Sequence, residues 1–583
     1  MLLDHLNDHG PLDVVGLHQL QQHLRSAILG RRMRAGREGI LGVMFPDMNV
    51  RINDGVFHRC VLSGSRGGYQ CGQSGAKLSA CHDKRTLSHA FSRVGRRSRL
   101  EYSLATTVHS STDLRNASPL PWLRWAIVLV PGLLLYFVPI TGLGAQQSHL
   151  LAIFAASIIA LVAQPVPMGV TLVVAMVLLA LTGTLPPVRV LSGFGNITVW
   201  LIFTAFLFAR AVTATGFGTR IGYLFIRQFA RSPLTLGYSI AAADLVLAPF
   251  IPSDTARGGG IIYPVARSVA ADFGSEPGPT AGRMGTYLML TAFHTTYIAS
   301  GIFLTGMAAN PLIADFAKKL GHVDLTWMTW FKGSSLPGFL SLAIIPWLLL
   351  RLFRPEIQDT EPARELARRE LKRLGPLSRD EKWLIAIMLG VMAGWVTSTW
   401  HGVPNTFVAL TGLSCVLLTR VLTWDDLLSE KRAWDALIWF APLLMMADAL
   451  TETGVIKFLS GHVFALLQGW SWPVALIALT VAYLYAHYTF ASMTAHITAL
   501  YPGFLAAALA AGAPPLVSAL ALAYFSNLNA GITHYGTGSA PVYFGSGYVR
   551  QMDWWKVGFL ISLLNIVIWL GVGMWWWKLI GIW

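Results

Sequence analysis

Residues 250–270 read FIPSDTARGGGIIYPVARSVA, and they place an aspartate, an arginine and three successive glycines inside a long apolar region. A charged side chain at the centre of a bilayer costs about 3 kcal/mol or more, so it persists only where protein or a water-filled cavity surrounds it. The stretch therefore marks a place lined by protein within a hydrophobic chain. Asp254 and Arg257 are its first candidate functional residues.

The chain as a whole has the composition of a membrane protein. Of its 583 residues, 54% are hydrophobic and 13% are charged, whereas soluble domains average about 25% charged residues. After Trp122, apolar runs of roughly 18 to 22 residues recur about ten times, and a helix of this length crosses the hydrocarbon core of a bilayer. We therefore expect an all-α polytopic membrane protein.

The positive charge of the chain is better explained by membrane topology than by nucleic-acid binding. The formal net charge is +15, but the Lys and Arg residues lie in the gaps between apolar runs, as the positive-inside rule describes. The four cysteines, Cys60, Cys71, Cys81 and Cys415, match neither a metal site nor a disulfide framework. We expect no metal, no cofactor and no nucleic-acid partner.

Four segments follow from the distribution of polar residues. Residues 1–118 are basic and lack the continuous apolar core of a secretory peptide. We interpret them as a poorly ordered extension or the product of a misplaced start, with a targeting extension or a cytoplasmic domain as alternatives. A first membrane half, 119–354, precedes a hydrophilic linker, 355–381, and a second membrane half, 382–583.

The Lys and Arg residues also orient the membrane region. Basic residues at 115–124, at 220–231 and throughout the linker favour the cytoplasmic side, whereas the uncharged connection TGLGAQQSH at 141–149 suits the outside. This pattern predicts a cytoplasmic N-terminus and an external C-terminus. A bacterial inner membrane is favoured over a plastid envelope.

The two halves resemble each other in sequence. WLIFTAFLFARAVTATG ends at Gly216 and IWFAPLLMMADALTETG ends at Gly454, 238 positions later. SDTAR begins at Ser253 and SMTAH at Ser492, 239 positions later, and each runs on to a Tyr-Pro pair. If five crossings separate equivalent elements, the second copy is inverted in the membrane. Inverted repeats indicate a secondary transporter with its site between them near the midplane.

Each repeat contains a predicted re-entrant hairpin, at 232–273 and at 472–512. The tip of such a hairpin exposes backbone N–H groups at the start of its second helix, and these groups attract an anion. Hydroxyl groups add donors, and glycine lets the chain approach a ligand closely. The first tip offers Ser253 and Thr255, and the second offers Ser492, Thr494 and His496.

Broken helices are expected opposite the two tips. Gly306, Asn310 and Pro311 interrupt the apolar run at 294–312, and a polar stretch interrupts the run at 524–548. Unwound backbone at membrane depth is tolerated only where it lines a cavity or is buried in protein. Four polar breaks that converge in pairs predict a single anion site.

These motifs carry a resemblance to a known family. PSDTARGGGIIYP, FASMTAHITALYP and NAGITHYGTGSAPVYFGSGY resemble the divalent anion:sodium symporter superfamily, in its sodium-independent branch of di- and tricarboxylate exchangers. The likeness covers nearly all of residues 120–583. It implies an elevator-type transporter of about eleven transmembrane helices plus two re-entrant hairpins. It also implies a dimer that binds a dicarboxylate between the hairpin tips.

The resemblance suggests a role for two basic residues. Sodium-coupled members of the family carry Ser-Asn-Thr in both tips, and sodium ions there neutralise the substrate. Here Arg257 and His496 each follow the motif by two positions, and such fixed cations suit a carboxylate. An empty carrier would then move buried positive charge across the membrane, so the resemblance implies obligate exchange rather than net uptake.

Two positions depart from the family's pattern. Asp254 replaces the usual Asn, and Met493 replaces Asn in the second tip. Asp254 either pairs with Arg257 and cancels part of its charge, or stays protonated as a hydrogen-bond donor. The second possibility would couple transport to protons, which keeps a sodium- or proton-coupled symporter as the alternative function.

Other readings of these residues are open. Ser and Thr often join membrane helices, an Arg can extend to the headgroups, and a lone His is commonly a packing residue. An enzyme is not expected because no H-x-x-x-H or H-E-x-x-H spacing occurs on a predicted helix, and a passive channel fits inverted hairpins less well. The candidate substrate-binding residues are Ser253, Asp254, Thr255, Arg257, Ser492, Thr494, His496, Asn527, Thr533, Gly536 and Thr537.

Overall fold

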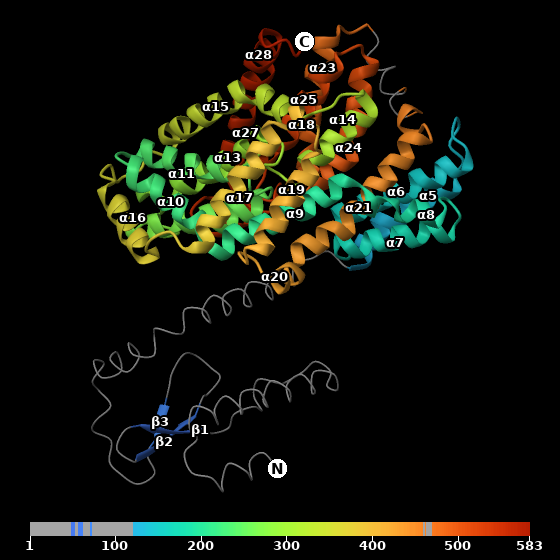
Figure 1. Cartoon of the computed structure of the whole chain (residues 1–583). Coiled ribbons are helices and arrows are strands. Elements are labelled where there is room, and N and C mark those ends of the chain that lie inside the picture. Colours follow the sequence, from blue (N-terminus) through green and yellow to red (C-terminus); the bar gives the residue numbers. More distant parts are fainter. Residues whose placement is uncertain (1–47, 53–55, 62–69, 73–120, 459–460, 462–468) are drawn as a thin grey trace. The chain divides into compact units, whose positions relative to one another are not determined.

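The computed structural model describes residues 48–52, 56–61, 70–72, 121–458, 461 and 469–583 (Figure 1). The chain divides into two units, Met1–Ala117 and Ser118–Trp583. The second unit carries every candidate residue.

The first unit contains a small sheet that the sequence did not predict. Strands β1 (Met48–Ile52), β2 (Val56–Val61) and β3 (Gln70–Gly72) form an antiparallel sheet in that order. Strands this short contain too few alternating positions to stand out from sequence alone. The rest of the predicted extension at 1–118 lies outside the described residues.

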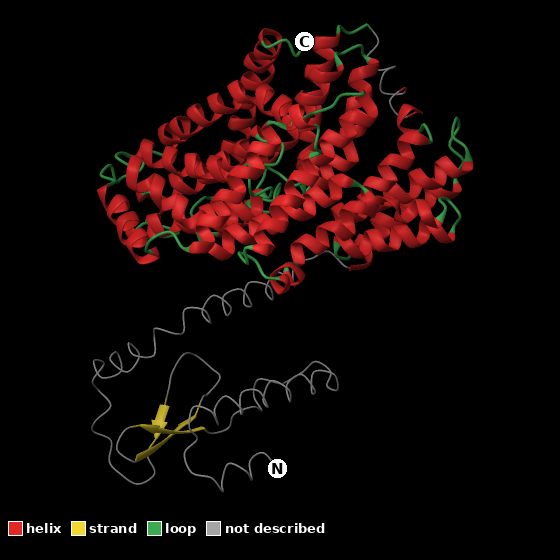
Figure 2. Cartoon of the chain, in the orientation of Figure 1, coloured by secondary structure: helices red, strands yellow, loops and turns green. Residues whose placement is uncertain are grey.

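All regular secondary structure among the described residues of the second unit is helical, and loops join the helices (Figure 2). Seven of its helices are long and apolar enough to cross a bilayer, so the predicted all-α, multi-pass membrane fold is confirmed. The helices of the first half are α5 (Pro121–Phe137), α6 (Ala145–Ala163), α7 (Met168–Leu181), α8 (Pro187–Leu191), α9 (Ile197–Thr215), α10 (Phe217–Phe229), α11 (Pro233–Leu247), α12 (Tyr263–Asp272), α13 (Gly285–Ile302), α14 (Asn310–Gly321) and α15 (Trp327–Leu352).

Helix α16 (Glu361–Leu374) lies between the halves. The second half contains α17 (Arg379–Val396), α18 (Ser398–His401), α19 (Asn405–Leu418), α20 (Trp424–Ser429), α21 (Lys431–Glu452), α23 (Trp472–Ala486), α24 (Met493–Ala510), α25 (Pro515–Leu528), α26 (Ala540–Gly545), α27 (Gln551–Ile566) and α28 (Gly573–Leu579).

The order of elements repeats between the halves. Helices α7, α9, α11, α13 and α15 of the first half recur as α19, α21, α23, α25 and α27 of the second. Gly216 follows α9, and Gly454 follows its counterpart α21. Both glycines have positive φ, 75° and 80° respectively. Packing is reciprocal as well, because α9 contacts α19 and α21 contacts α7. These features support an internal duplication.

The segment predicted as the first hairpin consists of two helices joined by a turn. Ser232 caps α11 through a hydrogen bond from the Thr235 N–H. After a non-helical turn, the chain returns as a π-helix, Thr255–Ile262, that continues into α12. In the second half, α23 ends in a short 3₁₀ turn, and Ser492 caps the return helix α24.

Helices α13 and α25 lie at the centre of the core, and each is interrupted. Nearly every residue of both is buried, and the two helices pack against each other. Their non-helical continuations are among the green segments in the middle of the bundle in Figure 2. Carbonyl groups exposed at the end of α13 receive side-chain donors, including the Trp330 indole to Gly301 O (2.9 Å) and Ser334 to Ile302 O (2.7 Å). The break is therefore built with its hydrogen bonds satisfied, as buried unwound backbone requires.

Candidate substrate-binding site

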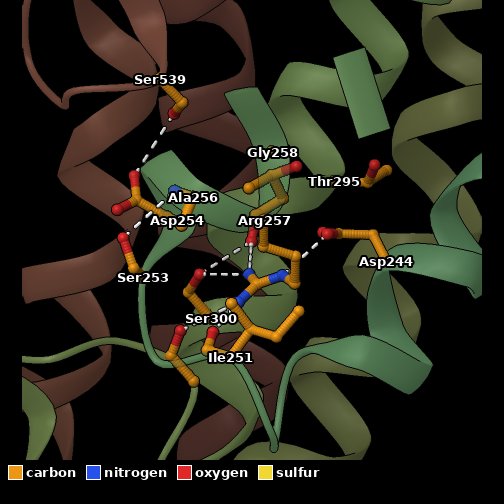
Figure 3. Close-up of polar contacts among 12 residues, drawn as sticks. Asp244, Ile251, Ser253, Asp254, Ala256, Arg257, Gly258, Thr295, Ser300 and Ser539 are labelled. Atoms are coloured by element: carbon orange, nitrogen blue, oxygen red, sulfur yellow. Dashed lines mark hydrogen bonds and ion pairs between the residues drawn. The ribbon is translucent and has the colours of Figure 1, made fainter. Parts of the chain in front are cut away.

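The first hairpin turn is organised around Arg257, which is fully buried (Figure 3). Its five N–H groups all have acceptors in the protein. The acceptors and donor–acceptor distances are Asp244 Oδ1 at 2.7 Å, Ile251 O at 2.8 Å, Gly306 O at 3.1 Å, Thr296 O at 3.0 Å and Ser300 Oγ at 2.6 Å. In this conformation the guanidinium has no N–H left for a substrate carboxylate.

Arg257 thereby joins three elements that the sequence separates. It links α11 through Asp244, the hairpin turn through Ile251, and the broken end of α13 through Ser300. Because Asp244 carries the opposite charge and is also fully buried, the pair is electrically neutral as a unit. A buried pair of this kind needs its remaining hydrogen bonds filled, and here those of the guanidinium are.

Asp254 points away from Arg257 and toward the polar stretch of the second half (Figure 3). Its Oδ2 accepts hydrogen bonds from the hydroxyl of Thr537 and from Ser539 Oγ (3.3 Å). The alternative in which Asp254 neutralises Arg257 is therefore wrong, because Asp244 occupies that role. Asp254 is 6% exposed and instead joins the first hairpin to the loop before α26.

The motif serines of the two tips occupy matching positions. Ser253 Oγ accepts from the Ala256 N–H at 3.1 Å, and Ser492 Oγ accepts from the Ala495 N–H at 3.3 Å. Each serine thus caps the returning helix of its hairpin and keeps its own hydroxyl hydrogen available. Both serines, and the neighbouring Thr255 and Thr494, are only partly buried. Their hydroxyl groups are therefore not enclosed by protein as Arg257 is.

The second tip lacks a counterpart to the Arg257 network. His496 occupies the equivalent position and is fully buried, but neither ring nitrogen has a hydrogen-bond partner within the described residues. Its ring lies against Tyr483, His487 and Phe490, with ring centroids 4.3, 4.9 and 5.1 Å away. A packing environment of aromatic rings replaces the hydrogen bonds of the first tip.

Two consecutive residues of the loop after α25 contact both hairpins. Gly536 O lies 2.8 Å from His487 Nε2 of the second hairpin, and Thr537 donates to Asp254 of the first. Next in the chain, Gly538 approaches Thr255 so closely that a Cβ there would lie 2.4 Å from Thr255 Oγ1. The loop therefore contacts both hairpins, one from each half.

The two broken helices also meet directly. Asn527 Nδ2 donates to Asn310 Oδ1 at 2.9 Å. Asn310 Nδ2 in turn donates to the carbonyls of Ser300 and Phe303 at 3.1 and 3.0 Å. This chain of hydrogen bonds connects the first half to the second through buried amides. Asn527 Oδ1 and Thr533 Oγ1 have no partner within the described residues.

The structure thus groups the candidate residues around one loop, although not all with free groups. The loop contacts Asp254 through Thr537 and lies against Thr255, and Gly536 of the same loop contacts His487. Arg257, in contrast, is enclosed by protein. Sequence reasoning missed Asp244, Ser300, His487 and Ser539. Asp244 had a visible signal, because it is a charge within the apolar stretch SIAAADLVLAPF, and the other three are ordinary polar residues until the fold brings them to the tips.

Comparison with known proteins places this site in context. The chain is 45% identical over 476 residues to YflS of Bacillus subtilis, whose name assigns it provisionally to malate transport; the match covers 81% of this chain and all of that protein. It is 41% identical to the chloroplastic dicarboxylate transporter 1 of Arabidopsis thaliana, over 82% of this chain and 88% of that protein. It is 32% identical to an L-tartrate/succinate antiporter of Escherichia coli, over 78% and 98%.

The family described as the sodium:sulfate symporter transmembrane region matches residues 120–583, which is the whole helical unit apart from its first residues. With the duplicated elements, the paired tips and the relatives above, the conclusion follows that this chain belongs to that family, the divalent anion:sodium symporters.

Proposed function

We propose that the protein is a secondary transporter that exchanges di- or tricarboxylates across the membrane without sodium, and that it is not an enzyme. The single observation that carries this proposal is the loop at Gly536 and Thr537, which contacts both hairpin tips. The names of the relatives, which refer to malate, dicarboxylate and tartrate/succinate transport, supply the substrate class.

The substrate would lie between the partly buried hydroxyls of the tips. Ser253 and Thr255 would bind one carboxylate, and Ser492 and Thr494 the other, since each pair lies at the start of a helix whose N–H groups favour an anion. The loop that contains Thr533, Gly536 and Thr537 would close the cavity. Asn527 and Asn310 would hold the two broken helices together.

The structure refines the part that Arg257 plays in this proposal. Its N–H groups are filled and its charge is balanced by Asp244, so it would shape the first tip rather than contact the carboxylate. The obligate character of exchange would then depend on the tips, whose exposed hydroxyls and helix N-termini favour movement with an anion in place. Movement would follow the elevator scheme of the resemblance, with both hairpins carried together against the remaining helices.

The first experiment is uptake of labelled malate, succinate, 2-oxoglutarate, tartrate, citrate and sulfate into proteoliposomes. Each substrate is tested with and without external sodium and with and without unlabelled substrate inside. Uptake that requires internal carboxylate and ignores sodium supports exchange. Sulfate is included because of the family's name, and preference for sulfate would contradict the carboxylate assignment.

One observation favours coupled uptake as the second candidate function. The Asp254 carboxylate is held by hydroxyl groups and not by a cation, so its charge needs a proton or a metal ion when an anion enters the site. A sodium- or proton-coupled symporter of the same fold would fill empty vesicles in response to an ion gradient. Substitution Asp254→Asn would then abolish the dependence on that gradient.

Three further features belong to this proposal. The lysines and arginines at 351–382 favour a cytoplasmic linker and N-terminus with an external C-terminus. We expect a bacterial inner membrane and a homodimer. Accessibility of single cysteines placed in the 141–149 connection and in the linker would decide the orientation, and the mass of the purified protein in detergent would decide the dimer.

A further inference from the structure

Unpartnered polar atoms gather beside the second hairpin tip. His496 Nδ1 and Nε2, His487 Nδ1 and Thr533 Oγ1 have no hydrogen-bond partner within the described residues, and all three side chains are 0% exposed. Buried polar groups almost always form hydrogen bonds, and a group that does not calls for an explanation. Several such atoms in one place indicate a site that is completed by something besides these side chains.

The three side chains are close neighbours. The imidazole rings of His487 and His496 have centroids 4.9 Å apart and planes at 75°. A Cβ at Gly536 would lie 2.9 Å from Thr533 Oγ1 and 3.0 Å from His487 Nε2, so Thr533 borders the same loop. The cluster of His487, His496 and Thr533 is called the histidine site below.

The hydrogen bond of His487 decides which ring nitrogen is free. Its Nε2 lies 2.8 Å from Gly536 O, and a carbonyl can only accept, so Nε2 carries the hydrogen. Nδ1 of a neutral His487 is then an unprotonated nitrogen with a lone pair. His496 contributes a second such nitrogen, because a neutral imidazole has one donor and one acceptor. The histidine site can therefore take up a proton.

No fixed charge faces the histidine site among the described side chains. Tyr483 lies against His496 and is hydrogen-bonded to Ser526. The other titratable or charged groups on the elements packed around α24 have partners elsewhere: Tyr485 with Ser562, Tyr501 with Ala519 O, Tyr524 with Trp330 O, His149 stacked on Tyr136, Lys318 with Asp324, and Lys319 with Asp315 and Asp448. The nearest charged group by connection is Asp254, through Thr537 beside Gly536.

We infer that the histidine site takes up one proton together with the substrate anion, an inference that rests on the proposed carboxylate transport. An imidazolium enclosed by aromatic rings is disfavoured because burial penalises a charge without a partner. A carboxylate at the adjacent Ser492 and Thr494 supplies that partner. The proton adds from solvent to an unprotonated ring nitrogen, and no bond breaks. By linkage, proton binding strengthens substrate binding to the same extent as substrate binding strengthens proton binding.

The two halves would then obtain their positive charge in different ways. The first half contains a permanent cation whose charge is balanced by Asp244. The second half would hold a cation only while an anion is bound. The histidine site would therefore be the proton-linked element of the exchange cycle.

Calorimetry of succinate and malate binding tests this inference directly. Titrations of the full-length protein in detergent at pH 7.5, in buffers with different heats of protonation, give the number of protons taken up per substrate bound. Both carboxylates of the free substrates are ionised at this pH, so the count belongs to the protein. We expect about one proton for the wild type, and none for His496→Gln or His487→Gln, with weaker binding in both.

The control is His322→Asn, because His322 ends α14 in a left-handed conformation (φ 53°) that asparagine also adopts. It should retain the wild-type proton count. Substrate binding without proton uptake by the wild type would overturn the inference and leave the proposed function intact. Loss of the uptake in Asp254→Asn but not in the histidine variants would also overturn it. Absence of carboxylate binding altogether would instead contradict the proposed function.

Discussion

The two hairpin tips have related sequences, but the basic residue of one is fully hydrogen-bonded to protein and that of the other is not. In the first tip, Arg257 donates all five of its hydrogen bonds to protein groups. In the second, His496 stands at the equivalent position, and neither of its ring nitrogens has a hydrogen-bond partner in the part of the chain that the structure describes. The repeats thus share a backbone arrangement in which Ser253 and Ser492 cap their helices alike. They differ in that protein groups accept every hydrogen bond of Arg257, whereas the nitrogens of His496 are left for a ligand or a proton.

The largest effect is expected from Arg257→Ala. The change leaves Asp244 buried without its cation and four other acceptors without donors, so the folded state should lose about 3–5 kcal/mol. The measurement is the midpoint of thermal unfolding in detergent. Arg267→Ala, on the exposed face of the same hairpin, is the matched control and should leave the midpoint nearly unchanged. If Arg257→Ala unfolds like this control and only transport is lost, Arg257 is a substrate ligand and not a structural link.

A smaller loss is expected from Thr537→Val, which removes the hydroxyl that Thr537 donates to Asp254. A hydrogen bond to a charged group contributes about 1.5–3 kcal/mol. Thr533→Val is the control within the same loop, because the Thr533 hydroxyl has no hydrogen-bond partner among the described residues, and its replacement by a similar shape should be nearly neutral. Equal losses in the two variants would contradict the assigned contact between the first tip and this loop.

Two ion pairs at equivalent positions of the repeats offer a third, weaker comparison. Asp448 on α21 and Arg210 on α9 occupy equivalent positions of the repeats; Asp448 pairs with Lys319 of α14, and Arg210 with Asp426 of α20. Lys319→Met should lower stability by about 1 kcal/mol, since the pair is partly exposed. The double variant with the charges exchanged, Lys319→Asp with Asp448→Lys, should recover part of the lost stability. No recovery would indicate that Asp315, the second partner of Lys319, dominates.

The smallest change in stability is expected from His496→Leu. Replacing a buried unpartnered polar group by an apolar group of similar size is nearly neutral or stabilising, so unfolding should shift by less than about 1 kcal/mol. Exchange of carboxylates should nevertheless be lost. Thermal unfolding and proteoliposome exchange on the same preparation measure both. A destabilisation as large as that of Arg257→Ala would mean that His496 is part of the structural core, and the contrast between the tips would fail.

Much of the fold followed from sequence because its signals are local. Apolar runs of membrane length predicted the helices, and the spacing of the paired motifs predicted two related halves. Gly306, Asn310 and Pro311 marked the break after α13 in the expected place. The three strands at residues 48–72 were not predicted, since short strands have no pattern strong enough to separate them from loops.

The positions of the candidate residues followed from sequence more than their hydrogen bonds did. Ser253, Thr255, Ser492 and Thr494 could be placed at the hairpin tips because residue type and position in a repeat suffice for that. The partner of Arg257 was not found, because two carboxylates, Asp244 and Asp254, lie within reach along the chain and only the turn of the hairpin decides between them. His487 was missed for a similar reason, since its contact with Gly536 spans 49 positions of sequence.

By itself, the sequence determined that this is a duplicated, multi-pass membrane protein with polar tips suited to an anion, because hydrophobic length, helix caps and repeated motifs act over a few residues. The tertiary structure alone decided which charged groups bind other protein groups and which polar groups remain free. Hydrogen bonds between distant segments depend on how α11, α13 and the loop after α25 come together. The donors of Arg257 were filled and the nitrogens of His496 left open by that packing, and not by either residue's identity.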